Sequence, residues 1–140
     1  MDKAANGLPD GAEDISTGGF NRFAGPFYRL PDEGGDENRV RRFAFVVLEK
    51  HMNGAGSVHG GLLMTFADIA MSRTSRLASG AKSCSTVALN CDFVGPGRLG
   101  DLIGIRVRVS RQTRTLVFLT AGISCGERVL MNAQGLWRIA

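Results

Sequence analysis

Residues 51–61 read HMNGAGSVHGG and lead directly into a largely apolar run over residues 62–71. Asp68 is the only charged residue of that run. Burying a lone carboxylate costs several kcal/mol unless it is paired or serves a chemical purpose. Glycines at a helix start let backbone N–H groups approach a ligand at the positive end of the helix dipole. The stretch therefore predicts a site that stabilises an oxyanion and brings a carboxylate to it.

Each polar residue of this stretch also has a structural interpretation when it is taken singly. For Asp68 the alternative is an ion pair with Arg73 or Arg76 on its own helix. His59 fits an ordinary position at a helix start. Asparagine, as at position 53, is common in glycine turns because its side chain bonds to the nearby backbone. The joint spacing of the three residues, rather than any one of them, favours a functional site.

One long helix must carry the carboxylate. The apolar pattern predicts a helix from about Gly60 to Leu77, with Ser57 as a possible cap and an end near Ser79 and Gly80. A helix that is apolar nearly all round must be wrapped by other elements. An antiparallel sheet that curls around it is the simplest solution.

The segments on either side of this helix predict strands and no second long helix. Residues 86–93 and 102–110 alternate between apolar and polar side chains, and residues 114–124 are continuously apolar at their centre. In the segment that follows the helix, Val87, Leu89, Cys91 and Phe93 are expected to share one face. Short turns between the later segments fit antiparallel neighbours. The predicted strands cover residues 25–30, 41–49, 86–93, 102–110, 114–124 and 129–139. The fold class is α+β, with a curved antiparallel sheet of five to six strands wrapped around one long central helix.

Composition describes an ordinary single domain. The chain has 140 residues, 44% of them hydrophobic, and a formal net charge of +4. We expect a mobile N-terminal lead-in over residues 1–19 and a folded domain over residues 20–140. The mild charge does not argue for a nucleic-acid partner, and no apolar run is long enough to span a membrane. Three cysteines without a CxxC pattern, and no signal-peptide pattern, predict a cytoplasmic protein with reduced thiols.

The pattern Asn53-x5-His59-Gly-Gly61-x6-Asp68 resembles the signature of hotdog-fold acyl-CoA thioesterases of the phenylacetate-pathway (PaaI) type, in the 4-hydroxybenzoyl-CoA thioesterase superfamily. The resemblance extends from about Gly19 to the C-terminus. It implies the hotdog fold and hydrolysis of an acyl-CoA thioester to a free acid and CoA. It also implies homodimers that assemble into homotetramers. No cofactor is expected, because the CoA thioester is the substrate, and no metal is expected, because no His/Cys/Asp cluster has ligand spacing.

The same resemblance assigns catalytic roles to five residues. Asp68 matches the helix carboxylate that acts as the nucleophile or as the base that activates water. Gly60 matches the residue whose backbone N–H holds the thioester oxygen, and Asn53 matches the amide that orients the thioester. His59 matches a residue near the thioester sulfur, and Thr86 matches a hydroxyl that assists the attacking water.

Contacts with CoA are implied by a looser part of the resemblance. Gly61 belongs to the same signature, and the segment that contains Arg111, Thr113 and Arg114 resembles the region that touches CoA. Arginine forks suit phosphate groups. Ala88 stands where some relatives carry an acidic residue, so their substrate preference is not expected here.

Helix geometry adds an inference of its own. Gly60 and Asp68 are eight residues apart, which separates them by about 12 Å along a helix axis. A reacting carbon needs both groups within about 3–3.5 Å. If both residues act on one thioester, they must come from different chains, so the site is expected to lie across a dimer.

Two other functions stay open. Hotdog domains also serve as hydratases or dehydratases of acyl thioesters, but the HGG-plus-Asp pattern disfavours them. A non-catalytic acyl-CoA-binding module is the other alternative, although such modules usually lose the helix carboxylate. The sequence does not indicate the acyl group, or whether CoA or an acyl-carrier protein is the carrier.

Overall fold

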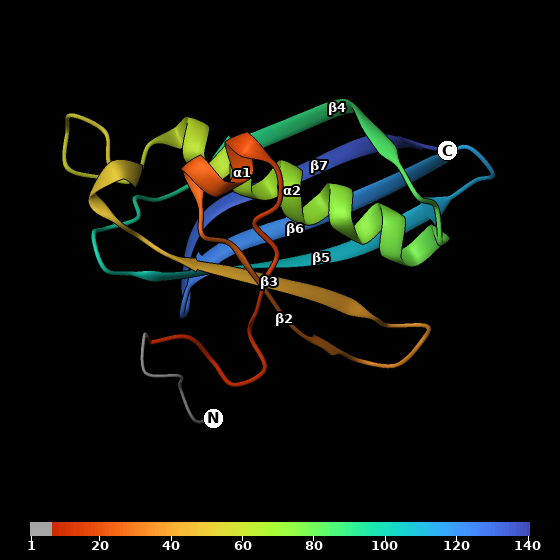
Figure 1. The fold of residues 1–140 in the computed structure, drawn as a ribbon, viewed down its shortest axis with the longest axis horizontal. Helices are drawn as coiled ribbons and strands as arrows, with labels where there is room; N and C mark the ends of the chain where they lie inside the picture. The colour runs from red at the N-terminus through yellow and green to blue at the C-terminus, as the bar shows by residue number, and fades with distance from the viewer. Residues whose placement is uncertain (1–6) are drawn as a thin grey trace.

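A single long helix lies in the hollow of a curved antiparallel sheet (Figure 1). The computed structural model describes residues 7–140. Seven strands form one sheet in the order β1-β2-β3-β5-β6-β7-β4. The strands are β1 (Glu13–Asp14), β2 (Tyr28–Glu33), β3 (Val40–Val46), β4 (Cys84–Phe93), β5 (Leu102–Gln112), β6 (Leu116–Cys125) and β7 (Arg128–Ile139). The helices are α1 (Gly19–Ala24), the 3-10 turn η1 (Glu49–His51) and the long α2 (Gly60–Ser79).

The predicted architecture is confirmed, and the strand count differs. The two-residue β1 brings the sheet to seven strands rather than five or six. Strand β1 lies within residues 1–19, the predicted mobile lead-in, and it pairs with β2. Leu8 and Ile15 of that segment are 2% and 4% exposed. Leu8 and Ile15 therefore hold this segment against the domain, although most of its other residues are exposed. Residues 1–6 lie outside the described part, and the mobility of the lead-in stays a prediction.

Helix α2 begins and ends for identifiable reasons. Its N-cap is His59, whose Nδ1 accepts a hydrogen bond from the Gly61 N–H at 2.9 Å, so the expected cap at Ser57 is wrong. Gly80 ends the helix with φ 76°, which favours glycine. Phe66, Ala67, Ala70 and Met71, among others, face the sheet and are fully buried.

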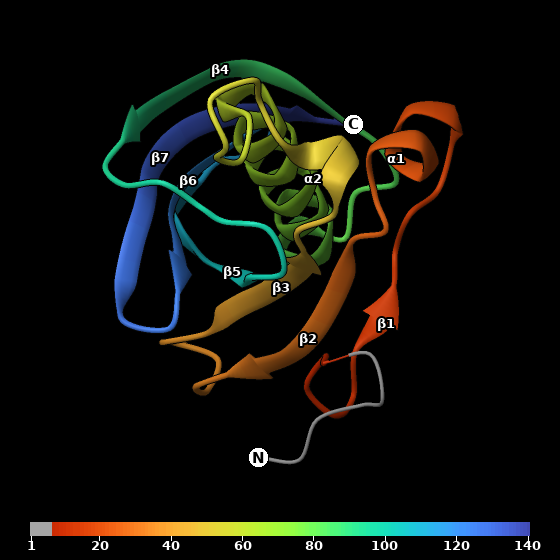
Figure 2. The ribbon, with the colours of Figure 1, turned by 90° about the vertical axis from the view of Figure 1, so that its left-hand side faces the viewer.

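The core lies between α2 and the concave face of the sheet, as the view along the helix shows (Figure 2). Phe66 of α2 packs between Phe27 and Phe45, with ring centroids 5.7 and 4.8 Å away. Trp137 of β7 is fully buried, and its Nε1–H donates to Ser72 Oγ of α2 at 2.7 Å. These contacts fix the position of the helix inside the sheet.

Strand β4 forms one edge of the sheet and contains a β-bulge. Thr86 lies opposite Trp137 and Ala88 lies opposite Leu136, so Val87 is an extra residue in the ladder. A bulge of this kind changes which side chains face the core. Leu89 and Cys91 face inward as expected, but Val87 is 57% exposed and does not share their face. The Thr86 side chain is directed toward α2 instead, where it bonds to Asp68.

No helix in the described part of the chain is long and apolar enough to cross a membrane.

Candidate active site

The start of α2 presents an unused backbone donor. The N–H of Gly60 has no acceptor among residues 7–140. A Cβ at this position would lie 3.2 Å from Cε1 of Phe93, so glycine keeps the space between the helix start and that ring. The free N–H at the positive end of a 20-residue helix can bind an oxyanion.

Asn53 shapes the loop that precedes α2. Its Oδ1 accepts hydrogen bonds from the N–H groups of Ala55 (2.9 Å) and Ser57 (3.0 Å), and its Nδ2 donates to Ser57 Oγ (3.0 Å). An amide nitrogen carries two protons, and the second has no acceptor in the described structure. Asn53 therefore holds the loop and keeps one N–H available, while its predicted contact with a thioester stays a prediction.

Asp68 is half-buried and is held by a hydroxyl rather than by a cation. Thr86 Oγ1 donates to Asp68 Oδ1 at 2.5 Å, which brings together two of the predicted catalytic residues. No ion pair within residues 7–140 joins Asp68 to Arg73 or Arg76, although the sequence allowed such a pair. A carboxylate with a free oxygen is able to accept a proton or attack a carbonyl carbon.

A small cavity opens beside this carboxylate. Its volume is about 150 Å³, and Asp68 forms part of its wall. The segment around α1 closes one side, and α2 forms the other. The lining residues are Ile15, Thr17, Asn21, Asp68, Ile69, Ser72, Arg73 and Arg76. Sequence reasoning missed the contribution of the N-terminal segment, because its packing on α2 depends on contacts between residues far apart in the chain.

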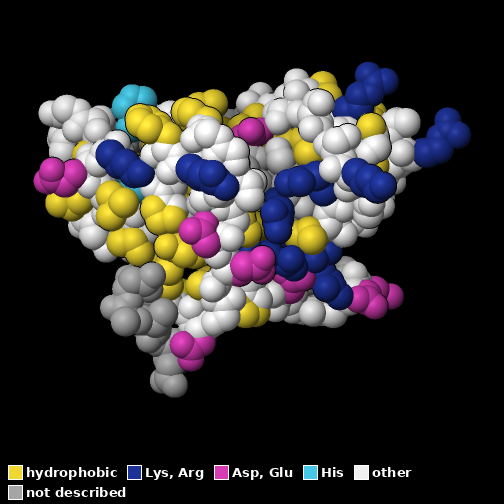
Figure 3. All heavy atoms as spheres, viewed as in Figure 1, with side chains coloured by type: hydrophobic (Ala, Val, Ile, Leu, Met, Phe, Trp, Pro, Cys, Tyr) yellow, Lys and Arg dark blue, Asp and Glu magenta, His cyan; other side chains and the backbone are white. Residues whose placement is uncertain are grey.

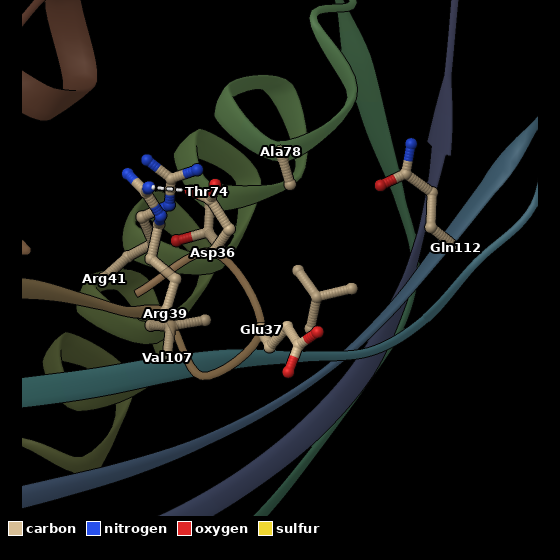
Figure 4. A pocket seen from close by; sticks show the side chains of 9 residues that line it. Asp36, Glu37, Arg39, Arg41, Thr74, Ala78, Val107 and Gln112 are labelled. Carbon is tan, nitrogen blue, oxygen red and sulfur yellow. Dashed lines mark hydrogen bonds and ion pairs between the residues drawn. The ribbon is translucent and has the colours of Figure 1, made fainter. Parts of the chain in front are cut away.

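A larger cavity of about 410 Å³ lies near the end of α2, where Thr74 and Ala78 line it (Figure 4). Asp68 is not among its lining residues. Its two arginines already have acidic partners: Arg39 pairs with Asp32 and Asp36, and Arg41 pairs with Asp32 at 2.9 Å. Burial lowers the pKa of Arg41, and the charge of Asp32 opposes that shift. Because its cations are neutralised and it lacks Asp68, this cavity is not the candidate active site.

His59 and Gly61 lie at the entrance to α2, as their spacing predicts. Both are exposed, and the bond between them closes the first turn. His59 thus has a capping role in the described structure, and a role near a thioester sulfur stays a prediction.

Apart from Gly61, the residues expected to touch CoA lie on the β5–β6 hairpin, at the end of the molecule where α2 ends (Figure 1). Thr113 Oγ1 accepts from the Leu116 N–H at 3.0 Å and thereby shapes the turn. Arg111 and Arg114 are exposed, and neither lines the cavity beside Asp68. The structure does not bring this hairpin together with the carboxylate within one chain.

His51, to which the sequence pattern assigns no role, is a structural residue. It is 2% exposed; its Nδ1 accepts from the Leu48 N–H, so its Nε2–H donates to the Ala24 carbonyl at 2.6 Å. Burial lowers the pKa of His51. The imidazole therefore links the end of α1, at Ala24, to Leu48, the residue before η1.

Comparisons with known proteins agree with this architecture. Residues 55–132 match the thioesterase superfamily. Over 116 residues the chain is 32% identical to a candidate esterase of Pseudomonas aeruginosa, covering 82% of this chain and 84% of that protein. Over 93 residues it is 33% identical to human acyl-coenzyme A thioesterase 13, covering 64% of each.

Two solved structures have a similar fold. The PaaI protein of Escherichia coli has a TM-score of 0.67 and 22% identity, covering 72% of each chain. A hypothetical thioesterase of Streptococcus pneumoniae, solved with coenzyme A, has a TM-score of 0.70 and 21% identity. That likeness covers 81% of this chain and 85% of the other.

Proposed function

The chain belongs to the thioesterase superfamily, as a hotdog-fold thioesterase of the PaaI type, and we propose that it hydrolyses acyl-CoA in a site shared by two subunits. Thioester hydrolysis follows from the family. Coenzyme A as the carrier is supported by the human relative, which is named for acyl-coenzyme A, and by the neighbour solved with coenzyme A.

The state of Asp68 carries the proposal. A half-buried carboxylate that is bonded only to the Thr86 hydroxyl retains a free oxygen, Oδ2, among the described residues. A structural carboxylate on a helix is usually neutralised by a nearby cation, and this one is not, although two arginines share its cavity. Its geometry suits a reacting group that a hydroxyl orients.

The reaction has two steps. In the first, a water that gives its proton to Asp68, or Asp68 itself, attacks the thioester carbon. The carbonyl oxygen becomes an oxyanion, which the Gly60 N–H and the helix dipole stabilise. In the second step, the oxyanion returns to a carbonyl and the C–S bond breaks. When water attacks, Asp68 passes the proton that it took from the water to the departing sulfur of CoA. When Asp68 attacks directly, CoA leaves as a thiolate and a water then hydrolyses the mixed anhydride, so that its two protons go to the thiolate and to the released acid and the Asp68 carboxylate is restored.

Two chains are needed because one helix cannot bring both groups to the same carbon. Gly60 and Asp68 lie about 12 Å apart along α2, at about 1.5 Å of rise per residue. A two-fold axis that places Asp68 of one subunit opposite Gly60 of its partner solves this problem. Met64 is midway between positions 60 and 68. The two-fold axis would therefore pass beside it, and Met64 of one subunit would face Met64 of the other.

Exposed apolar residues support such a dimer. Met64 is 38% exposed on α2 and offers apolar surface to a partner. Strand β4 leaves one edge of the sheet unpaired, and Val87 and Phe93 on it are more than half exposed. An open apolar edge is an aggregation hazard unless another chain covers it. We infer that a second copy pairs there, and that two dimers associate into a tetramer.

The function is tested by thiol release from a panel of CoA thioesters with aryl, arylacetyl, short, medium and long acyl groups. We expect release of free CoA from at least one of them. Asp68→Asn should lower kcat by about 10²–10⁴-fold, the range for loss of a general base, with a change in Tm of a few degrees at most.

The matched control is Glu127→Gln, which neutralises an exposed carboxylate in the β6–β7 turn. It should keep the unsubstituted rate. Hydrolysis by Asp68→Asn at the unsubstituted rate would remove Asp68 from the mechanism. Binding of acyl-CoA without thiol release would favour a binding module, and hydration of an enoyl-CoA would favour a hydratase.

A further inference from the structure

Two arginines in the cavity beside Asp68 have no acidic partner. Arg73 and Arg76 follow Asp68 on α2 by five and eight positions, or about 7.5 and 12 Å along the axis. Both are half-buried. Neither forms an ion pair or donates a side-chain hydrogen bond within residues 7–140. Several cationic side chains are visible on the face that α1 and α2 present (Figure 3).

The other half-buried arginines of the described chain behave differently. Each of them lies within 4 Å of an acidic oxygen. The pairs are Arg29 with Asp32, Arg41 with Asp32, Arg42 with Glu33 and Arg128 with Asp101. Removing a guanidinium from water without a partner is unfavourable, so this molecule generally supplies one. Arg73 and Arg76 are the exceptions, and they share one cavity.

We propose that Arg73 and Arg76 together bind an anionic group of the substrate, so that the thioester is oriented on Asp68. The inference rests on the proposed function and extends it to substrate recognition. The anionic group is a phosphate of CoA or a carboxylate on the acyl chain, since a guanidinium fork binds either through paired hydrogen bonds.

The cavity has the size and lining for one such group. Its volume of about 150 Å³ accommodates a phosphate or a carboxylate, but not a whole coenzyme. Thr17, Asn21 and Ser72 add polar residues to its lining, and Ile15 and Ile69 add apolar ones. Because Asp68 repels an anion, the group must lie toward the arginine end, which leaves the carboxylate free to react.

This assignment differs from the CoA contacts expected on the β5–β6 hairpin. Arg111 and Arg114 are exposed, so water already solvates their charges. A phosphate gains less from an exposed cation than from one that is partly desolvated. The two helix arginines are therefore expected to contribute more to substrate binding than the two hairpin arginines.

The test compares Arg73→Gln, Arg76→Gln and the double variant on four substrates. Two are CoA thioesters, one with an apolar acyl group and one with a terminal carboxylate. Two are the matching thioesters of N-acetylcysteamine, which lacks phosphates. We expect each single variant to raise KM about tenfold or more, and the double variant up to about a hundredfold, with kcat nearly kept.

The pattern identifies the anionic group. If it is a phosphate, both CoA thioesters are affected and neither N-acetylcysteamine thioester is. If it is a carboxylate, both carboxylated substrates are affected and the apolar ones are not. Arg108→Gln, which removes an exposed cation from β5, is the control and should change no KM.

Thermal unfolding separates recognition from a structural role. If the arginines serve recognition, removing these unpaired, half-buried charges should leave Tm unchanged or raise it. If they serve the fold, their removal should lower Tm and raise KM equally for all four substrates. Unchanged KM on all four substrates in the double variant, or an equal loss on all four with a lowered Tm, would overturn the proposal. If the unsubstituted protein cleaves no member of the acyl-CoA panel described above, the proposed function fails, and calorimetric titration with the four thioesters still measures whether the arginines bind them.

Discussion

At the scale of single residues, the structure separates the ionisable side chains that stabilise the fold from those that remain free. His51 is enclosed and bonded through both ring nitrogens. Asp68 is bonded at one oxygen only, and Arg73 and Arg76 are not paired at all in the described chain. None of these three charges has an ionic partner among the described residues, and they share one cavity, which is the arrangement expected where a substrate supplies the missing partner.

The buried imidazole predicts a pH dependence of stability. Its pKa is lowered by burial, although the bond to the Ala24 carbonyl favours the charged form. An unfolded chain takes up a proton on this histidine near pH 6.5, and the folded chain does so only at lower pH. The unfolded state therefore binds more protons, and stability is lost as pH falls below about 6.5 toward the folded pKa.

We expect His51→Gln, which does not titrate and whose amide N–H replaces the donor to the Ala24 carbonyl, to flatten this dependence. The measurement is the urea midpoint of unfolding between pH 7.5 and pH 5, for the variant and the unsubstituted protein. His59→Gln, at the exposed second histidine, reports the contribution of the other imidazole. Parallel pH curves for His51→Gln and the unsubstituted protein would show that His51 is not the titrating group.

At the scale of elements, the bulge in β4 decides which side chain meets Asp68. Without an extra residue, every second side chain of β4 would lie on the same face as Leu89 and Cys91. Val87 would then face inward and Thr86 would face outward. The bulge at Val87 shifts this alternation. The neighbouring strand accommodates it at Gly135, which has no side chain to collide with β4.

Gly135→Ala should therefore destabilise the protein. The added Cβ would lie 2.6 Å from the Ala88 carbonyl oxygen and 2.5 Å from the Trp137 ring. We expect a loss of about 1 to 3 kcal/mol in the free energy of unfolding, as for other overpacked sites. Activity should also fall, because β4 must shift and Thr86 moves with it.

Gly122→Ala is the matched control in the adjacent strand, since its Cβ would meet nothing closer than 3.7 Å. It should be neutral or slightly stabilising, because alanine loses less conformational freedom than glycine on folding. Denaturant unfolding and thiol release measure both effects. Equal stability of the two variants would contradict the close approach of β4 and β7 at Gly135.

At the scale of the whole molecule, the proposed site exists only when two chains meet. Asn53→Ala and Asp68→Ala should each be inactive as homodimers. In a hybrid dimer, one of the two sites combines an intact loop with an intact carboxylate. Mixing the variants and allowing subunit exchange should restore up to about a quarter of the unsubstituted activity, as half of the dimers are hybrids with one intact site each.

The two-fold register offers an independent check on the same assembly. Met64→Cys should form a disulfide between subunits under mild oxidation, because position 64 faces its own copy when Gly60 meets Asp68 of the partner. The unsubstituted protein, with three half-buried cysteines, is the control for other cross-links.

In the mixing experiment, absence of rescue after verified subunit exchange would count against a shared site. A chain that remains monomeric would contradict the dimer itself.

Sequence periodicity alone determined most of the architecture. The apolar run with Gly80 at its end predicts α2 to within two residues, and alternating or continuous apolar segments between turns predict the six longer strands. These features are local, since a helix or strand reports its buried face every few residues along the chain. The spacing of Gly60 and Asp68 likewise implies a second chain if both residues act on one thioester, because the rise of a helix per residue is constant.

Tertiary structure alone decided what surrounds Asp68. The inward turn of Thr86 depends on the register between β4 and β7, and the packing of residues 8–19 depends on a surface formed by distant segments. The sequence also does not predict that Arg73 and Arg76 lack an acidic partner in the described chain. Their helical spacing from Asp68 permits an ion pair but does not require one. Local patterns specify which face of an element is buried, but only the assembled fold specifies which side chains meet across it.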